Sequence, residues 1–461
     1  MCGIVGIVGH PHLFDTLHDA GNKLQHRGTD GTGIILSDGT SFLVPSPHRV
    51  TGLVSSCFDA WPGTKPEDVH IGLLHVRYGT SGKRQSFENI QPFIIDSPRH
   101  GKFAIAHNGD SQDIEAIRDA FVGGGIGFAS TSDTEVLGQL IAHAKNQTLP
   151  EAIVCALEKV KSAFALVIAT PSSLIAVRDP YGYRPLSLGK FRDGGYIVAS
   201  ETASFEIVGA EYVRDIDPGE VLVIDKNGLH EGCNKPFQFT PQKHAQCVFE
   251  LIYFSYPTSL VFGYRASVFR HTLGKRLAME AAHILTDGNP VLIPVPESGL
   301  HYAQGVSHQS GIPLTFALSR SRYSHSGRTF IIAEEAERGK KLLAKFNINT
   351  EFVKGKDCVL VDDSVVRGNT MRALVQKFRE HGARKVSVLV GSPPIMHPCR
   401  YGIDFKTSRE LLAAEHHADV QAMCAFLGAD ALHYLALETL YEEVRDRDNF
   451  CFACFNGEYA L

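Results

Sequence analysis

The stretch from residue 359 to residue 390 restricts the possible folds more than any other part of the sequence. An apolar run, Val359-Leu360-Val361, leads into two acidic residues, a glycine-containing turn and a helical pattern that stops at Gly382. A second apolar run follows at residues 386–390. A strand, a helix and a strand in this order form a β-α-β unit, whose two strands are parallel. We therefore predict a parallel sheet in the C-terminal half of the chain.

Two acidic residues, Asp362 and Asp363, fall at the carboxyl end of the first strand of this unit. Parallel sheets bind their ligands at that edge, and adjacent carboxylates suit ribose hydroxyls and Mg²⁺. Backbone N–H groups of the turn and of the helix N-terminus suit a phosphate. An Asp-Asp pair that simply ends a strand is the ordinary alternative, and spacing alone leaves both open.

The complete string from Val359 to Thr370 is more specific, because it resembles the phosphoribosylpyrophosphate (PRPP) loop of type I phosphoribosyltransferases. The resemblance implies that Asp362 and Asp363 bind the ribose and Mg²⁺, with Ser298 beside the metal. It therefore implies an α/β phosphoribosyltransferase domain. The residues that it assigns to the 5′-phosphate are Ser364, Arg367, Gly368, Asn369 and Thr370.

The opposite end of the chain begins Met1-Cys2-Gly3 and continues as an apolar, glycine-interrupted run that predicts a buried strand. Removal of the initiator methionine makes Cys2 the first residue, with a thiol and a free α-amine together. The amine, whose unperturbed pKa is about 8, can act as the general base that activates the thiol. From position alone, a cysteine that merely follows the start codon is the alternative.

Four residues further along match what an amide hydrolase acting on an amino acid requires. Arg77 offers a fork of donors to an α-carboxylate, and Asp133 can pair with an α-amine. The side-chain amide of Asn108 and the backbone N–H of Gly109 can face a developing oxyanion. Taken singly, these residues also fit a surface ion pair, a helix cap and a simple turn.

Five strings of the N-terminal half, MCGIVGI, LQHRG, HVRYGT, AHNGD and TSDTE, together resemble the class II glutamine amidotransferase domain. The resemblance implies an α+β N-terminal nucleophile (Ntn) hydrolase fold, in which two stacked β-sheets lie between helices. The implied site residues are Cys2 as nucleophile, Arg77, Thr80 and Asp133 as glutamine ligands, Asn108 and Gly109 as the oxyanion hole, and Arg27 as the residue that orders the site.

The domain boundary follows from where these resemblances end. We assign the glutaminase domain to residues 2–224 and a linker to residues 225–246, where the chain is polar and carries glycine and proline. The second domain spans residues 247–461. Within it, helical spacing predicts a helix over Val268–Leu285, and an apolar run predicts a strand over Pro290–Val295.

Over its whole length the chain resembles the glutamine PRPP amidotransferases (amidophosphoribosyltransferases). The implied reaction is hydrolysis of glutamine at Cys2, passage of ammonia through a channel, and displacement of pyrophosphate from PRPP·Mg²⁺. The product is 5-phospho-β-D-ribosylamine, in the first step of purine biosynthesis. The resemblance also implies purine nucleotides as inhibitors and a homodimer or homotetramer. The segment from Arg320 to Arg328 resembles the lid that closes over PRPP.

A Cys-x-x-Cys pair, Cys451 and Cys454, lies near the C-terminus. Its spacing alone leaves zinc, a redox pair and two unligated thiols open. Cys247 and Cys399 lie in strings that resemble the iron–sulfur branch of the same family. That resemblance implies a [4Fe–4S] cluster on Cys247, Cys399, Cys451 and Cys454. Neither half-reaction transfers an electron, so we expect a structural or oxygen-sensing cluster.

Composition narrows the partners and the compartment. The net charge of −5 gives no basic footprint, so we expect no nucleic acid partner. No apolar run approaches the roughly 18 to 20 residues that span a bilayer, and we expect no membrane partner. We expect a cytoplasmic protein, in which the ten cysteines are reduced or bind metal.

Several positions depart from the usual family strings, among them Asp110, the stretch Tyr256-Pro257-Thr258-Ser259 and the longer lid. These departures leave two alternatives open. One is another class II amidotransferase, such as a sugar-phosphate aminating enzyme, against which the phosphate loop argues. The other is a non-catalytic PRPP-binding paralogue with a redox-sensing cluster, against which the intact Cys2, Arg77 and Asp133 argue.

Overall fold

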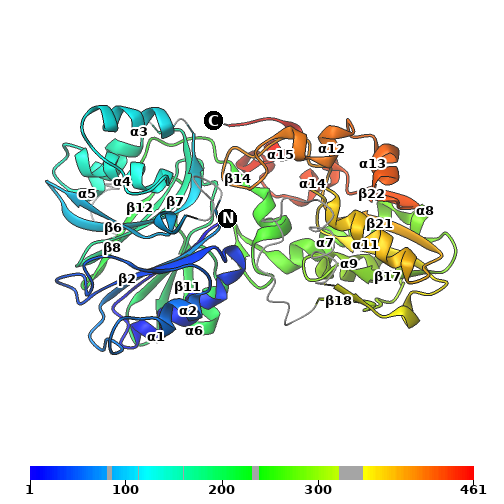
Figure 1. Cartoon of the computed structure of the whole chain (residues 1–461), viewed down its shortest axis with the longest axis horizontal. Helices are drawn as coiled ribbons and strands as arrows, with labels where there is room; N and C mark the ends of the chain where they lie inside the picture. Colours follow the sequence, from blue (N-terminus) through cyan, green and yellow to red (C-terminus); the bar gives the residue numbers. More distant parts are fainter. Residues whose placement is uncertain (80–85, 113, 159, 231–237, 321–345, 461) are drawn as a thin grey trace.

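The computed structural model of the chain describes residues 1–79, 86–112, 114–158, 160–230, 238–320 and 346–460. Its two halves lie side by side, and the N-terminus lies between them (Figure 1). Thr80 and all but the first residue of the lid segment fall outside the described residues. No helix within the described ranges combines the length and the apolar character that crossing a membrane requires.

The N-terminal half contains two antiparallel sheets. Their strand orders are β11-β9-β10-β1-β4-β2-β3 and β13-β12-β8-β7-β6-β5. The strands are β1 (Gly3–Val8), β2 (Gly31–Ser37), β3 (His48–Val50), β4 (Ile71–Arg77), β5 (Phe93–Ser97), β6 (Gly101–Ser111), β7 (Ser162–Ala169), β8 (Ser173–Arg178), β9 (Ser187–Phe191), β10 (Tyr196–Ala199), β11 (Ala210–Asp215), β12 (Val221–Asp225) and β13 (Gly228–Leu229).

The first strand, β1, shows how the sheets are stacked. Ile4 and Val8 pack between the two sheets, whereas Val5 and Ile7 pack against helices outside the first sheet. A Cβ on Gly6 would lie 2.9 Å from a side chain of the second sheet, so glycine permits the close approach. The predicted arrangement of stacked sheets between helices is confirmed. The outer helices are α1 (Leu13–Lys23), α2 (Val54–Asp59) and α6 (Ala203–Val208) on the first sheet, and α3 (Ile114–Gly123), α4 (Asp133–His143) and α5 (Leu149–Leu157) on the second.

The predicted linker at residues 225–246 begins inside the second sheet. Strand β13 pairs antiparallel with β12, and Gln238 forms a bridge with Glu220. The ring of Phe239 is 1% exposed and lies 5.8 Å from that of Phe164. The start of this stretch therefore belongs structurally to the N-terminal half.

The C-terminal half is built on a four-stranded parallel sheet of order β17-β20-β21-β22. Strand β20, helix α11 and strand β21 are the predicted β-α-β unit. The remaining elements are short or pack around this sheet. The bounds are β14 (Gln246–Cys247), a π-helical turn (Glu250–Phe254), β15 (Leu260–Val261), β16 (Tyr264–Arg265), α7 (Ala266–Glu280), α8 (Ala282–Leu285), β17 (Pro290–Pro294), α9 (Leu300–Ser310), β18 (Leu318–Arg320), β19 (Phe346–Ile348), β20 (Asp357–Asp362), α11 (Asn369–Glu380), β21 (Lys385–Val390), α12 (Leu412–Glu415), α13 (Val420–Leu427), β22 (Ala431–Tyr434), α14 (Leu437–Glu443), β23 (Phe450–Cys451) and α15 (Ala453–Asn456).

The single helix predicted over Val268–Leu285 is wrong in one respect, because the chain forms α7 and α8 instead. At Ala281 the backbone leaves the helical region, with φ −95° and ψ 20°. The N–H groups of Ile284 and Leu285 both bond back to the Ala281 carbonyl. The side chains of Ile284 and Leu285 remain buried in this turn. The apolar pattern therefore continues across Ala281 and does not indicate that the helix is interrupted there.

Candidate active site

Cys2 lies directly before β1 and is only 9% exposed. Its Sγ lies 3.5 Å from the backbone nitrogen of Tyr78 and 3.6 Å from the Tyr78 carbonyl oxygen. Its backbone N–H donates to Oδ1 of Asn108 at 3.2 Å, and its carbonyl accepts from Nε of Arg27 at 2.8 Å. The structure therefore fixes the thiol and both backbone groups of Cys2, as a positioned nucleophile requires.

Met1 precedes this site and is buried. Burial lowers the pKa of its α-amine to about 5, which favours the neutral form of an amine in this region. Removal of Met1 turns the nitrogen of Cys2 into the α-amine, beside its own thiol. A neutral amine there has the lone pair that a general base needs.

Asn108 and Gly109 lie in β6 next to Cys2. Asn108 is fully buried, and its Nδ2 has no hydrogen-bond partner within the described part of the chain. A buried amide N–H without a partner is costly unless a ligand oxygen completes it. A Cβ on Gly109 would lie 1.8 Å from the Ala163 carbonyl oxygen, so only glycine fits there. The predicted oxyanion donors thus lie together, and one of them still has a hydrogen to donate.

A pocket opens beside Cys2 and brings together two of the predicted glutamine ligands, Arg77 and Asp133. Arg77, at the end of β4, is 4% exposed, and Asp133, at the start of α4, is 3% exposed. Oδ1 of Asp133 accepts from the Thr134 N–H at 2.9 Å. The pocket therefore offers a cation, an anion and a thiol to one small molecule. The lining residues are Cys2, Arg77, Tyr78, Gly79, Gln91, His107, Gly109, Ser132 and Asp133.

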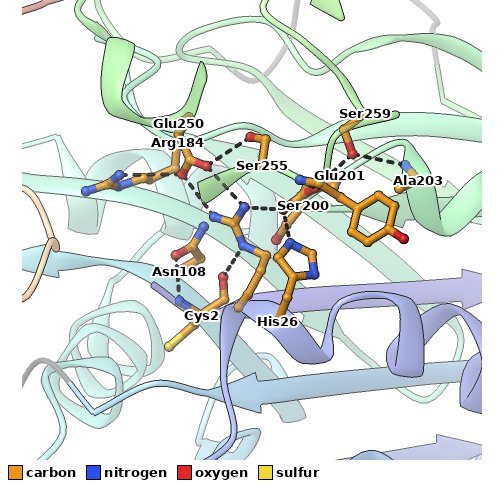
Figure 2. A network of polar contacts seen from close by, with 12 residues as sticks. Cys2, His26, Asn108, Arg184, Ser200, Glu201, Ala203, Glu250, Ser255 and Ser259 are labelled. Atoms are coloured by element: carbon orange, nitrogen blue, oxygen red, sulfur yellow. Dashed lines mark hydrogen bonds and ion pairs between the residues drawn. The ribbon is translucent and has the colours of Figure 1, made fainter. Parts of the chain in front are cut away.

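A buried ion network lies behind Cys2 (Figure 2). Arg27 pairs with Glu201 and makes two bonds to Glu250, at 2.9 and 3.1 Å. Glu250 also lies 3.5 Å from Nη1 of Arg184. All four side chains are at most 2% exposed. Arg27 thus lies beside Cys2, and three other charged groups hold in place the guanidinium that donates to the Cys2 carbonyl.

The sequence motifs did not identify the partners of Arg27. Burial raises the pKa of Glu201, but His26 and Arg27 lower it more strongly, so the net pKa lies far below the ordinary value. Arg27 and Glu250 are 223 residues apart, and no local pattern connects them. The one available signal was an acid, Glu250, inside an otherwise apolar run, because such an acid is rarely buried without a partner.

The second site lies at the carboxyl end of β20, where Asp362 and Asp363 were predicted. Oγ of Ser298, which follows β17, donates to Oδ1 of Asp362 at 3.4 Å. Burial and the neighbouring Asp363 raise the pKa of Asp362 well above its ordinary value. Two adjacent carboxylates, Asp363 buried and Asp362 partly buried, with a hydroxyl beside them fit the oxygen ligands that Mg²⁺ prefers.

The phosphate loop leads from this acidic pair into α11. Gly368 has a φ of +74°, a left-handed conformation that favours glycine, and Asn369 and Thr370 begin the helix. The backbone N–H groups at this helix start are suited to a phosphate. Ser364 donates to Asp363 through its hydroxyl. This geometry is compatible with the predicted phosphate ligands apart from Arg367.

Arg367 is oriented differently from the expectation. Its Nε donates to Oε2 of Glu410 at 2.9 Å, and its Nη2 donates to the Asp404 carbonyl at 3.3 Å. In this structure its charge is therefore paired with a carboxylate of the segment that follows β21. A phosphate ligand role for Arg367 requires this ion pair to open.

The four cysteines assigned to a cluster line one cavity. Burial raises the pKa of Cys247 to about 11 and raises the pKa values of Cys451 and Cys454 further. Within the described ranges, no group of three or more His, Cys, Asp or Glu side chains is arranged to hold a single metal ion. The cavity is lined by Tyr183, Cys247, Cys399, Tyr401, Ile403, Cys451, Ala453, Cys454 and Tyr459.

Two family models match this sequence. The one described as glutamine amidotransferase domain matches residues 79–206, and the one described as phosphoribosyl transferase domain matches residues 267–391. The amidophosphoribosyltransferase of Bacillus subtilis (strain 168) is 38% identical over 464 residues, which cover 99% of this chain and 94% of that protein. The chain belongs to the amidophosphoribosyltransferase family. This result confirms the predicted family and the predicted order of two domains.

Other members of the amidophosphoribosyltransferase family agree. The chloroplastic amidophosphoribosyltransferase 1 of Arabidopsis thaliana is 39% identical, over 100% of this chain and 78% of that protein. A solved structure, the glutamine PRPP amidotransferase from B. subtilis complexed with ADP and GMP, superposes with a TM-score of 0.88 and 37% identity. The match covers 100% of this chain and 97% of that one. The likeness therefore extends over both halves and favours the PRPP-dependent reaction over that of other class II amidotransferases.

Proposed function

We propose that the chain makes 5-phospho-β-D-ribosylamine from glutamine and PRPP, with glutamate and pyrophosphate as the other products. One observation carries this proposal. The Cys2 pocket and the acidic pair of β20 occur in one chain, and direct contacts such as the hydrogen bond from Tyr78 to Asp404 join the two halves. We propose that ammonia released at the first site passes to the second through a channel shielded from water, which would otherwise compete.

In the first half-reaction, Sγ of Cys2 attacks the side-chain amide carbon of glutamine. The α-amine of processed Cys2 takes the thiol proton and passes it to the leaving ammonia. The developing oxyanion accepts hydrogen bonds from Nδ2 of Asn108 and the backbone N–H of Gly109. Water then releases glutamate from the thioester. Arg77 and Asp133 hold the α-carboxylate and the α-amine, and Thr80 is the third ligand that we propose.

In the second half-reaction, ammonia attacks C1 of PRPP and pyrophosphate leaves. Asp362, Asp363 and Ser298 hold Mg²⁺, which supplies charge neutralisation for the departing pyrophosphate. Asp362 and Asp363 also bind the ribose hydroxyls. The 5′-phosphate rests on the loop before α11. Its proposed ligands are Ser364, Arg367, Gly368, Asn369 and Thr370, with Arg367 released from Glu410.

We further propose a [4Fe–4S] cluster on Cys247, Cys399, Cys451 and Cys454. Burial raises the pKa values of Cys247, Cys451 and Cys454, and a metal partner would stabilise their thiolate forms. A cavity between four thiols suits a group of several atoms better than one zinc ion, whose sulfur ligands lie about 2.3 Å from the metal. The cluster supplies cross-linking between β14, the segment after β21 and the C-terminal strand. Equal iron and sulfide content after anaerobic purification, lost in Cys451→Ser, tests this assignment.

We propose three further properties: inhibition by purine nucleotides, an oligomeric assembly and a cytoplasmic location. The B. subtilis relative is complexed with ADP and GMP, which supports purine nucleotides as inhibitors here. A homodimer or homotetramer is our proposal for the assembly. The cytoplasm is our proposal for the compartment, because reduced cysteines persist there.

An assay with two nitrogen sources tests the proposed function. Wild type and Cys2→Ala are supplied anaerobically with PRPP·Mg²⁺ and either glutamine or an ammonium salt. We expect Cys2→Ala to release pyrophosphate only with ammonium, and Asp362→Asn to release none from either source. No turnover by wild type from either source would favour a PRPP sensor instead.

A further inference from the structure

Arg184 lies in the loop between β8 and β9 and is completely buried. Its Nη2 donates to the Tyr401 carbonyl, and its Nη1 lies 3.5 Å from Oε1 of Glu250. Within the described ranges, its Nε and Nη1 have no hydrogen-bond partner. A buried guanidinium with so few acceptors is costly, because its lost hydration is not replaced. The position therefore requires more negative charge than the Glu250 oxygen supplies.

Two cysteines of the cavity, Cys247 and Cys399, interact electrostatically with Arg184. Burial lowers the pKa of Arg184, but Cys247, Glu250 and Cys399 raise it, and the net pKa lies above the ordinary value. The neighbouring Tyr183 lines the cavity, and its ring stacks on that of Tyr401 at 4.1 Å. Arg184 is thus next to the cavity wall.

The opposite side of Arg184 leads to the nucleophile. Glu250 is shared between Arg184 and Arg27, and Arg27 donates from Nε to the Cys2 carbonyl at 2.8 Å. Figure 2 shows Arg184 and Glu250 on one side of this network, with Cys2 and Asn108 below them. Two ion pairs and one hydrogen bond therefore connect Arg184 with the backbone carbonyl of the nucleophile.

We propose that Arg184 is a positioning residue that balances the negative charge of the occupied cysteine cavity and, through Glu250 and Arg27, holds Cys2 in its reactive position. This inference rests on the proposed cluster. Without the charge of the cavity, Arg184 competes more strongly with Arg27 for the Glu250 carboxylate, which bonds to Arg27 at 2.9 and 3.1 Å and lies 3.5 Å from Arg184. Arg27, the donor to the Cys2 carbonyl, is then held less firmly. The reactivity of Cys2 towards glutamine follows the state of the cysteine cavity for this reason.

The test compares full-length wild type with Arg184→Met and Arg184→Lys, purified anaerobically. The first readout is the decay of cluster absorbance under an iron chelator, and the second is the cluster reduction potential. The third is the alkylation rate of Cys2 by a diazoketone analogue of glutamine, followed by peptide mass. For Arg184→Met we expect decay about tenfold faster and alkylation about tenfold slower. We expect the reduction potential of the cluster to be lower in Arg184→Met, because a cluster gains an electron less readily when a nearby cation is lost.

Two controls separate charge from general damage. Arg184→Lys keeps the charge and restores most of the potential. Arg214→Met removes the ion pair with Glu220 elsewhere in the same half and leaves all three readouts unchanged. If Arg184→Met does not fold, Arg184→Gln replaces it, with the same expected shifts.

A double-mutant cycle tests the connection itself. We expect Cys454→Ser to slow the alkylation of Cys2 in the protein that retains Arg184, and to have little further effect in the protein that carries Arg184→Met. Suppose that wild type contains the cluster and that Arg184→Met leaves the cluster decay, the reduction potential and the Cys2 alkylation rate unchanged. That result overturns the role of Arg184 and leaves the proposed function standing. A wild type without iron and sulfide overturns the cluster and this inference together, whereas the glutamine-dependent assay still reports the function.

Discussion

The phenol of Tyr78 donates to Oδ2 of Asp404 at 3.3 Å and thereby joins the glutamine pocket to the C-terminal half. The backbone of Tyr78 contacts the Cys2 thiol, and the Asp404 carbonyl accepts from Arg367 of the phosphate loop at 3.3 Å. Lys406 adds an ion pair across the same boundary, with Asp110 at 2.8 Å. The segment after β21 therefore contacts both candidate sites.

Tyr78→Phe removes the cross-domain hydrogen bond and keeps the ring. We expect glutamine-dependent turnover to fall by roughly two- to tenfold, because a net hydrogen bond contributes about 0.5–1.5 kcal/mol. Turnover with ammonium stays close to wild type. Asp404→Asn keeps an acceptor oxygen and has a smaller effect. An equal loss with both nitrogen sources would show that Tyr78 supports the fold rather than the link.

Asn108→Ala removes the only oxyanion donor that comes from a side chain. We expect kcat with glutamine to fall by about 10²- to 10³-fold, because one preorganised donor contributes that much in comparable sites. The KM for glutamine changes little, since Arg77 and Asp133 remain. Steady-state kinetics with both nitrogen sources check this. A variant that loses ammonium-dependent turnover as well would contradict the assignment.

Glu250→Gln tests the buried network through stability. Arg27 and Arg184 lose a shared carboxylate in a site without solvent, and we expect the free energy of unfolding to fall by about 3–5 kcal/mol. The matched control is Glu211→Gln, in which an exposed ion pair with Arg192 is lost at a cost of about 1 kcal/mol or less. Equilibrium unfolding in urea measures both. Equal losses would mean that the buried pairs are no stronger than exposed ones.

Asp179, at the turn after β8, makes stability depend on pH. Burial raises its pKa from 3.8 to about 6, although Arg178 opposes the shift. The folded chain holds the carboxyl proton of Asp179 more tightly than the unfolded chain does. The stability that this proton contributes is therefore complete below the unfolded pKa and is lost as pH rises through about 6. Relative to Asp179→Asn, we expect the free energy of unfolding to fall by up to about 3 kcal/mol over this interval. A pH-independent difference between the two proteins would refute the shift.

Local sequence was sufficient where a residue and its role lie in one motif. The apolar run at the start of the chain became β1, buried on both faces, and the Val359–Thr370 string became the end of β20 and the start of α11. Cys2 directly precedes β1, Arg77 ends β4 and Asp133 begins α4, and all three line one pocket. Asn108 lies within β6 and accepts from the Cys2 N–H. Strand and helix periodicity constrains such positions strongly.

Long-range pairing was not predictable from the same patterns. No sequence pattern singled out Arg184, which pairs with Glu250 and interacts with two cysteines of the cavity. Arg367 was assigned to phosphate, but the side chain of Glu410, which lies 43 residues further on, binds it. Such contacts depend on how distant segments of the chain pack together. The periodicity of a single helix or strand does not predict that packing.

The stoichiometry of product release tests the central claim most directly. Purified protein is supplied anaerobically with glutamine and PRPP·Mg²⁺, and glutamate and pyrophosphate are measured in the same reaction. The account predicts equal amounts of both products, with neither formed from glutamine by Cys2→Ala. Glutamate without pyrophosphate, or no turnover at all, would contradict it.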